Sequence, residues 1–134
     1  MAVEVVDESG AAVDLDRLVA QAEFLIEALS LHPDCELSIL LVGLDRMAEL
    51  HVEWMDEAGP TDVLSFPMDE MVEGDPEPGI LGDIVLCPAF DSELDLMLTH
   101  GMLHLLGHDH AEDEERAVMF GRQATLLDAW RGRP

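Results

Sequence analysis

Basic residues are scarce in this 134-residue sequence. It has no lysine and six arginines against thirty aspartates and glutamates, so the formal net charge is −24 at pH 7. Such a surface repels polyanions and does not bind nucleic acid through bulk electrostatics. A basic patch, if there is one, is expected in the last twenty residues, which hold Arg116, Arg122, Arg131 and Arg133. The alternative is that the acidity reflects a generally acidic proteome, such as a high-salt one, and carries no functional message.

Cysteines and long apolar runs are also few. Cys35 and Cys87 are the only cysteines, and a cytosolic chain of this size does not need a disulfide. We therefore expect reduced thiols in the core rather than a cysteine-containing zinc site. The N-terminus lacks the basic start and apolar stretch of a signal peptide, and the longest apolar runs are too short to span a bilayer. The sequence predicts a soluble cytoplasmic protein that does not act at a membrane.

Four of the six histidines fall within residues 100–110, and three of them, His100, His104 and His110, follow the spacing H-x3-H-x5-H. Residues four apart lie on one face of a helix. Gly107 can take the left-handed conformation that ends a helix and turns the chain back. Three neutral imidazoles with an open fourth position are typical of a catalytic zinc centre, so we predict one Zn²⁺ per chain. Nickel or cobalt fits the same ligands, and a histidine-rich helix end without metal is the alternative.

The same stretch lacks one carboxylate. Metzincin proteases read H-E-x-x-H-x-x-G-x-x-H, and Gly101 stands where they carry their general-base glutamate. The spacing therefore keeps the geometry of a zinc hydrolase without the base of a protease. A zinc metalloprotease-like hydrolase remains an alternative, weakened by this glycine.

The length and the 49% apolar composition predict a single domain over residues 1–134 with one hydrophobic core. Strands are expected at 3–6, 37–42, 61–66 and 80–86, and helices from 15 to about 31, 45–55, through the histidine stretch, and 113–130. Asp14 is the expected N-cap of the first helix. The acidic segment 68–79, rich in proline and glycine, is expected to be a mobile loop between strands. The predicted class is α/β, with a small mixed sheet of about four strands and a zincin-like metal helix in the core.

Three motifs resemble the YbeY family of rRNA-maturation endoribonucleases. The H-G-x-L-H-L-x-G-[YH]-D-H signature of that family is met by residues 100–110, P-T-D-V-L-S-F-P by 60–67, and L-G-D-I-V by 81–85, followed by Cys87-Pro88. Their order and spacing agree over about residues 35–128. The resemblance implies that His100, His104 and His110 are zinc ligands. It also implies endonucleolytic hydrolysis of single-stranded RNA, in small-subunit rRNA 3′-end maturation and ribosome quality control.

The implied partners are the single-stranded rRNA substrate and the small ribosomal subunit with its proteins, with no DNA. Asp83 would belong to the surface that meets this subunit. The chain departs from the family at three places. Met55 stands where many members have an arginine suited to a phosphate, and position 108 is His where Tyr is usual. The segment between Pro88 and His100 looks shorter by about a dozen residues.

Without a glutamate at position 101, the proton acceptor is the zinc-bound hydroxide, Asp109 or an RNA phosphate oxygen. Asp109 is counted among the catalytic candidates, although orienting or capping roles are favoured for it. If the 2′-OH of the RNA attacks instead of water, the products carry a 2′,3′-cyclic phosphate. Thr61 and Ser65 either edge the substrate groove or satisfy neighbouring backbone groups. His51 and His108 are further groove candidates. A surface role is the alternative for His51. For His108 the alternatives are a ligand that rivals His110, an acid for the leaving oxygen, or a spectator, and the last is favoured.

A third function belongs to a different class: a non-catalytic ribosome-assembly binding factor with a structural zinc. Both the −24 charge and the loss of an arginine at Met55 lower direct RNA affinity, which gives this alternative some weight. The same charge predicts weak RNA binding in isolation and dependence on a partner for substrate delivery.

Overall fold

The computed structural model describes residues 2–55, 62–90 and 93–133. Within these ranges four strands and four helices alternate over most of the chain, which confirms the α/β class. In chain order they are β1 (Val3–Asp7), α1 (Leu15–Ala28), β2 (Glu36–Leu41), α2 (Leu44–Met55), β3 (Val63–Pro67), β4 (Ile80–Leu86), α3 (Leu94–Leu105) and α4 (Asp113–Arg131). Asp14 caps α1 as expected, since its carboxylate accepts a hydrogen bond from the backbone N–H of Arg17.

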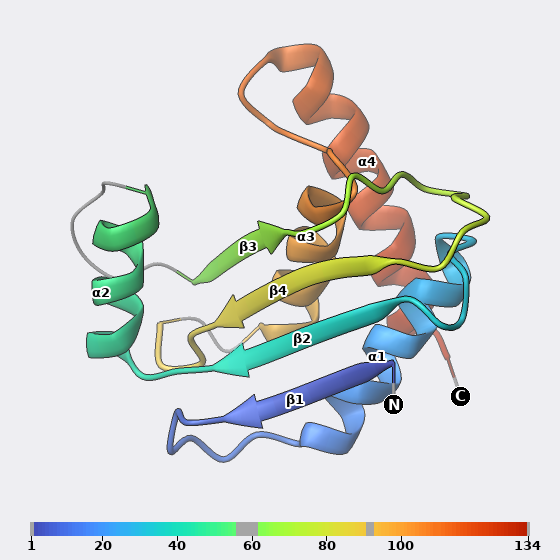
Figure 1. The fold of residues 1–134 in the computed structure, drawn as a ribbon. Coiled ribbons are helices and arrows are strands. Elements are labelled where there is room, and N and C mark those ends of the chain that lie inside the picture. The colour runs from blue at the N-terminus through green and yellow to red at the C-terminus, as the bar shows by residue number, and fades with distance from the viewer. Residues whose placement is uncertain (1, 56–61, 91–92, 134) are drawn as a thin grey trace.

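The strands form one mixed sheet in the order β1-β2-β4-β3 (Figure 1). The pairs β1-β2 and β2-β4 are parallel, while β3 runs antiparallel to β4. Parallel neighbours need a crossover connection, and α1 provides it between β1 and β2. The antiparallel pair needs only the connection at 68–79. The sheet therefore has the expected number of strands and the expected mixed pairing.

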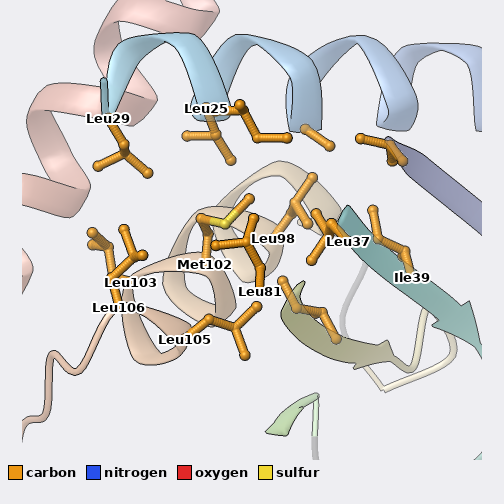
Figure 2. Packing of buried hydrophobic residues seen from close by; sticks show 14 of the residues in the cluster. Leu25, Leu29, Leu37, Ile39, Leu81, Leu98, Met102, Leu103, Leu105 and Leu106 are labelled. Atoms are coloured by element: carbon orange, nitrogen blue, oxygen red, sulfur yellow. The ribbon is translucent and has the colours of Figure 1, made fainter. Parts of the chain in front are cut away.

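Two hydrophobic clusters cover the two faces of the sheet. One face packs against α1 and α3, and α4 adds Met119 and Leu126 to the same cluster. Figure 2 shows Leu25, Leu98 and Met102 meeting Leu37 and Leu81 there. The opposite face carries a smaller cluster beneath α2: Val42, Met47, Leu50, Leu64, Val85 and Cys87. Strand residues alternate between these clusters, as the pleat of a sheet requires. Both cysteines are buried free thiols, as expected.

Helix α3, which carries two of the three histidines, lies at the centre of this packing. Seven of its twelve residues are buried, and only its first turn and the histidine face are partly exposed to solvent. A helix that is apolar on most of its circumference belongs in a core. The histidines are therefore held by a rigid element rather than by a loop.

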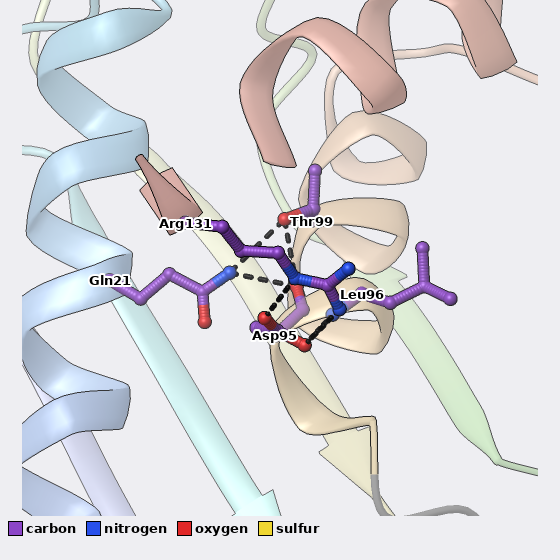
Figure 3. A network of polar contacts seen from close by, with 5 residues as sticks. All are labelled: Gln21, Asp95, Leu96, Thr99 and Arg131. Atoms are coloured by element: carbon purple, nitrogen blue, oxygen red, sulfur yellow. Dashed lines mark hydrogen bonds and ion pairs between the residues drawn. The ribbon is translucent and has the colours of Figure 1, made fainter. Parts of the chain in front are cut away.

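A polar network fixes the rotation of α3 against its neighbours (Figure 3). Gln21 of α1 donates from Nε2 to the carbonyl oxygen of Asp95 at 2.7 Å and to the hydroxyl of Thr99 at 3.1 Å. Arg131 of α4 donates to both carboxylate oxygens of Asp95, at 2.8 and 3.0 Å. Gln21 and Thr99 are buried, so each needs these partners to avoid an unpaired polar group. Thr99 precedes His100, and the network thus sets the direction of the first candidate ligand.

The Asp95–Arg131 pair predicts a pH-dependent contribution to stability. The hydrogen bonds from Arg131 are the largest cause that lowers the pKa of Asp95 below its usual 3.8. A carboxylate whose pKa is lowered in the folded state stabilises the fold fully above pH 3.8. This stabilisation is lost as the pH falls through the pKa of the folded state. We expect Asp95→Asn to lower Tm by a few degrees at pH 7 and by less at pH 3. Thermal melts at both pH values check this, with Glu23→Gln on the exposed face of α1 as the control. An equal Tm drop at both pH values would contradict it.

The connection between β3 and β4 is anchored at several points. Met71 is buried in the main core, and the backbone N–H of Gly74 donates to the carbonyl oxygen of Leu29. Glu73 pairs with Arg122 of α4 at 3.0 Å. The segment that was expected to be a mobile loop therefore packs against the end of α1 and against α4. No helix in the described part of the chain is both long and apolar enough to cross a membrane.

Candidate metal centre and its cleft

The end of α3 turns the chain back as the position of Gly107 predicts. Gly107 has a φ of +90°, in the left-handed region, and its N–H donates to the carbonyl oxygen of His104. The next N–H, from His108, donates to the carbonyl oxygen of Leu103. This pair of bonds is a Schellman motif, which satisfies the last carbonyls of the helix. The turn brings His110 back toward the face of α3 that carries His100 and His104.

The three histidines do converge. Each can place a ring nitrogen so that all three nitrogens lie within 4.8 Å of one another. The rings of His100 and His104 meet edge to face, with their Nε2 atoms 3.1 Å apart. The centroid of the His110 ring lies 5.4 Å from that of His100 and 5.2 Å from that of His104. His100 and His104 are half-buried and His110 is exposed, so the cluster faces solvent on one side. This donor set could hold a metal ion with an open coordination position.

Outer hydrogen bonds set the orientation of both helical rings. The Nδ1–H of His104 donates to the backbone oxygen of His108 at 2.9 Å, and that of His100 to Oε1 of Gln123 at 2.8 Å. A carbonyl oxygen only accepts, so these bonds place the proton of each neutral ring on Nδ1. Both Nε2 lone pairs then lie 3.1 Å apart, an arrangement that a cation bound beside them would stabilise. Such outer partners are typical of metal-ligating histidines.

Electrostatics keep His104 in the neutral form that a metal requires. Burial is the main cause that lowers the pKa of His104 below its usual 6.5, and the neighbouring His100 and His110 rings lower it further. The hydrogen bond to the His108 carbonyl and the charge of Asp109 act in the opposite direction. Burial and the neighbouring rings prevail, so His104 offers a free lone pair at neutral pH.

Gln123 should therefore matter for metal affinity although it is not a ligand in the cluster. We expect Gln123→Ala to weaken zinc binding by about 10–100-fold, because the His100 ring loses its orienting acceptor. Competition titration against a fluorescent chelator measures this. Thr125→Ala, an exposed position on the same helix, is the control, and equal affinities for the two variants would show that Gln123 does not orient the ligand.

The cluster lies in an open cleft of about 670 Å³ between β3 and the end of α3. Ser65, His51, His108 and Asp109 line it with the three histidines. The Ser65 hydroxyl donates to the carbonyl oxygen of Gly101 at 3.2 Å, so it satisfies a backbone group as well as facing the cleft. Thr61 lies outside the described residues. The cleft therefore brings together every described groove candidate that the sequence suggested.

Asp109 and Arg116 hold the backbone of His110. The Asp109 carboxylate accepts from the N–H of His110 at 2.7 Å, and the Arg116 guanidinium donates to its carbonyl oxygen at 3.3 Å. A carboxylate used in this way holds the backbone of the candidate ligand, and the orienting role favoured for Asp109 from the sequence stays a prediction.

Two sequence candidates lie elsewhere. Asp83 is exposed on β4, where the sheet registers it between Ser38 of β2 and Phe66 of β3, and it does not line the cleft. Met55 ends α2, at the border of the described residues. Asp83 does not contribute to the histidine cluster.

The arginines do not form a basic surface at the cleft. Arg46, Arg116, Arg122 and Arg131 each pair with a carboxylate. Arg17 and Arg133 lie over aromatic rings, Trp130 at 5.1 Å and Phe24 at 5.0 Å. None of the six lines the cleft within the described part of the chain. The acidic composition is therefore not offset by local positive charge at this site.

Sequence reasoning missed two residues beside the cluster, Gln123 and Phe120. The Phe120 ring lies 6.3 Å from that of His100 and 6.0 Å from that of His110. Both residues belong to α4, three positions apart on one helical face. That face could have been recognised only by knowing that α4 packs beside α3.

A family model described as "Endoribonuclease YbeY" matches residues 5–131. This chain belongs to the YbeY family. Relatives of that name from Thermobifida fusca, Acidothermus cellulolyticus and Nocardioides sp. are 50%, 48% and 46% identical to it. The matches cover 98%, 98% and 99% of this chain and 95%, 92% and 100% of the relatives. The solution structure of TM1509 from Thermotoga maritima is similar in fold, with a TM-score of 0.61 and 27% identity over 97% of this chain and 89% of that one.

This YbeY chain is shorter than its relatives within the matched region. The alignment with the Thermobifida fusca relative spans 147 positions, whereas the chain has 134 residues, so at least 13 positions have no counterpart here. This number of missing positions agrees with the shortening of about a dozen residues that was expected between Pro88 and His100. Its location there stays a prediction, although the structure does begin α3 at Leu94, soon after the turn at 88–90.

Proposed function

We propose that residues 1–134 form a single zinc-dependent domain that cleaves single-stranded RNA internally. One observation carries this proposal: the nitrogens of His100, His104 and His110 converge within 4.8 Å in an open cleft of about 670 Å³. Membership of a family described as an endoribonuclease supplies the class of substrate. Three imidazoles around an open position suit a catalytic zinc ion better than a structural one, which is usually fully enclosed by four ligands.

The residues present fit a zinc ion. His100 and His104 turn their unprotonated Nε2 atoms toward each other, and His110 reaches the same point from the turn after Gly107. When bound, zinc supplies Lewis acidity and lowers the pKa of a water to about 7, which makes a nucleophile available near neutral pH.

The protein's own side chains would hold and orient this centre. Gln123 and the His108 carbonyl fix the two helical rings, and Asp109 fixes the backbone of the third. His51, Ser65 and His108 line the cleft and are proposed to contact the RNA. Asp109 is proposed to orient rather than to act as general base, because its carboxylate already accepts a backbone N–H.

The proposed biological role is maturation of the 3′ end of small-subunit rRNA and ribosome quality control, in the cytoplasm. Because no arginine is among the described residues that line the cleft, the protein's own charge does little to attract the RNA. We propose that the small ribosomal subunit delivers the substrate and that exposed Asp83 belongs to the surface that meets it.

The protease alternative receives no support from the site. A Cβ at position 101 would point between Ile84 and Ser65, at 3.1 Å from each, toward β3 and β4. A carboxylate attached there would meet the sheet before it could serve the cleft. The non-catalytic binding factor agrees with the acidic surface, and the following experiment separates it from the nuclease.

We expect the zinc-loaded protein, purified without a histidine tag, to cleave a labelled single-stranded RNA and to leave the matching duplex intact. A chelator should reduce cleavage to background, and stoichiometric zinc should restore it, because the nucleophile depends on the metal. Metal analysis of the same sample should find about one zinc per chain. Bound zinc with no cleavage of free RNA or of RNA within small-subunit particles would favour the binding factor. Casein digestion is the control for proteolysis.

A further inference from the structure

A second, smaller pocket opens beside the cleft, between the start of α3 and α4. Its volume is about 140 Å³, and its lining includes the apolar side chains of Leu96, Met97 and Phe120. Asp62, Val63 and His100 line both this pocket and the main cleft. The two spaces are therefore neighbours on either side of the His100 ring. A molecule bound at the histidine cluster can extend into the smaller pocket.

Phe120 presents an apolar ring at this junction. Its side chain is 44% exposed, whereas the fold of α4 relies on other residues that are buried: Met119, Leu126, Leu127 and Trp130. The ring approaches the candidate ligands His100 and His110 to about 6 Å between centroids. Single exposed apolar residues are common, but this one lies against a polar cluster and at the mouth of a pocket. Its position serves the site rather than the core.

We propose that Phe120 and this side pocket receive one nucleobase of single-stranded RNA, next to the phosphate held at the histidine cluster. This inference rests on the proposed function. When an RNA phosphate lies at the histidine cluster, the group that enters the side pocket must be close to that phosphate along the RNA chain. The flat group next to each phosphate in RNA is a nucleobase. Bases stack on aromatic side chains whatever their sequence. Gln123 also lines the pocket, where its amide group could meet the polar edge of a base.

The charge of the protein strengthens this assignment. RNA-binding proteins usually gain affinity by neutralising phosphates, but here the cleft has no arginine among its described lining residues. Stacking is then the main non-electrostatic contact that the site can offer. A base within a duplex is already stacked and paired, so it cannot enter the pocket without being extruded. The pocket would thus give the site a preference for single strands.

The test compares Phe120→Ala and Phe120→Trp with Val118→Ala, an exposed apolar position on the same helix that lines neither pocket. Stacking is worth about 1–3 kcal/mol per base, so we expect Phe120→Ala to lower kcat/KM for single-stranded RNA by about 5- to 150-fold. Zinc content should be unchanged. Phe120→Trp should keep most of the activity, Val118→Ala all of it, and an abasic RNA should abolish the difference between wild type and Phe120→Ala.

Binding is measured separately from cleavage. Zinc-loaded protein is titrated into a 2′-O-methyl single strand carrying 2-aminopurine, whose fluorescence falls when its ring stacks, and a gel verifies that the strand stays intact. Quenching that Phe120→Ala removes supports the stacking site even if no RNA is cleaved, in which case only the proposed catalysis fails. Normal cleavage and quenching by Phe120→Ala overturn the inference and leave the nuclease standing. A wild-type protein that neither quenches nor cleaves overturns both.

Discussion

His104→Ala is expected to abolish zinc-dependent RNA cleavage and to weaken zinc binding by more than about 100-fold. A residue that only orients a ligand already contributes about 10–100-fold to metal affinity, and His104 is at the centre of the cluster. Its Nε2 lies 3.1 Å from that of His100, and its ring also contacts that of His110. Its Nδ1–H bond to the His108 carbonyl fixes the turn that presents His110. One substitution therefore removes one ligand and loosens another.

The measurement is the zinc-induced rise in Tm. A ligand that binds only the folded state stabilises it by about 2.7 kcal/mol at 100 times its Kd, so the wild type should show a clear shift and the variant almost none. His32→Ala is the matched control, because His32 lies in the turn between α1 and β2 and lines no part of the cleft. Circular dichroism of the metal-free variants separates a lost ligand from a lost fold. A variant that keeps the wild-type zinc shift would remove His104 from the ligand set.

The sequence was sufficient for those parts of the site that depend on local rules. The four-residue step from His100 to His104 and the glycine at 107 determine one helical face and one turn, and both occur as expected. The element boundaries also agree closely, since α1 ends before His32-Pro33 and β4 spans residues 80–86 as expected. Short-range periodicity and terminator residues contain this information.

Contacts between distant segments could not be predicted in this way. Gln123 meets His100 across 23 residues, and Gln21 meets Thr99 across 78, because α1 and α4 pack beside α3. A single sequence shows where these helices lie along the chain but not which of their residues face one another. The connection at 68–79 was misjudged for the same reason. Its acidic, glycine-rich composition suggested mobility, while the burial of Met71 and the Glu73–Arg122 pair depend on tertiary packing.

Gly101→Glu is expected to unfold the protein rather than to create a protease. The glycine is buried where α3 crosses β3 and β4, and a Cβ would already lie 3.1 Å from Ile84 Cγ2 and from Ser65 Oγ. Overpacking of a core costs about 1–3 kcal/mol, and a buried carboxylate without a partner adds several more. Together these approach the whole stability of a typical domain, about 5–15 kcal/mol. Urea denaturation of Gly101→Ala, where only the methyl group is added, should show a smaller loss of about 1–3 kcal/mol.

Gly121→Glu is the matched control, because a Cβ at this exposed position of α4 meets nothing within 4 Å. Glutamate is a better helix former than glycine, so this variant should be as stable as the wild type or slightly more so. A folded Gly101→Glu protein that digests casein would contradict the expectation and would show that the side chain can reach the cleft. The packing of the fold thus requires a glycine at position 101, and this requirement excludes a carboxylate there as much as the chemistry of the site does. The close approach of α3 to β3 that the glycine allows lets Ser65 bond to the Gly101 carbonyl and brings the strand to the edge of the histidine cleft.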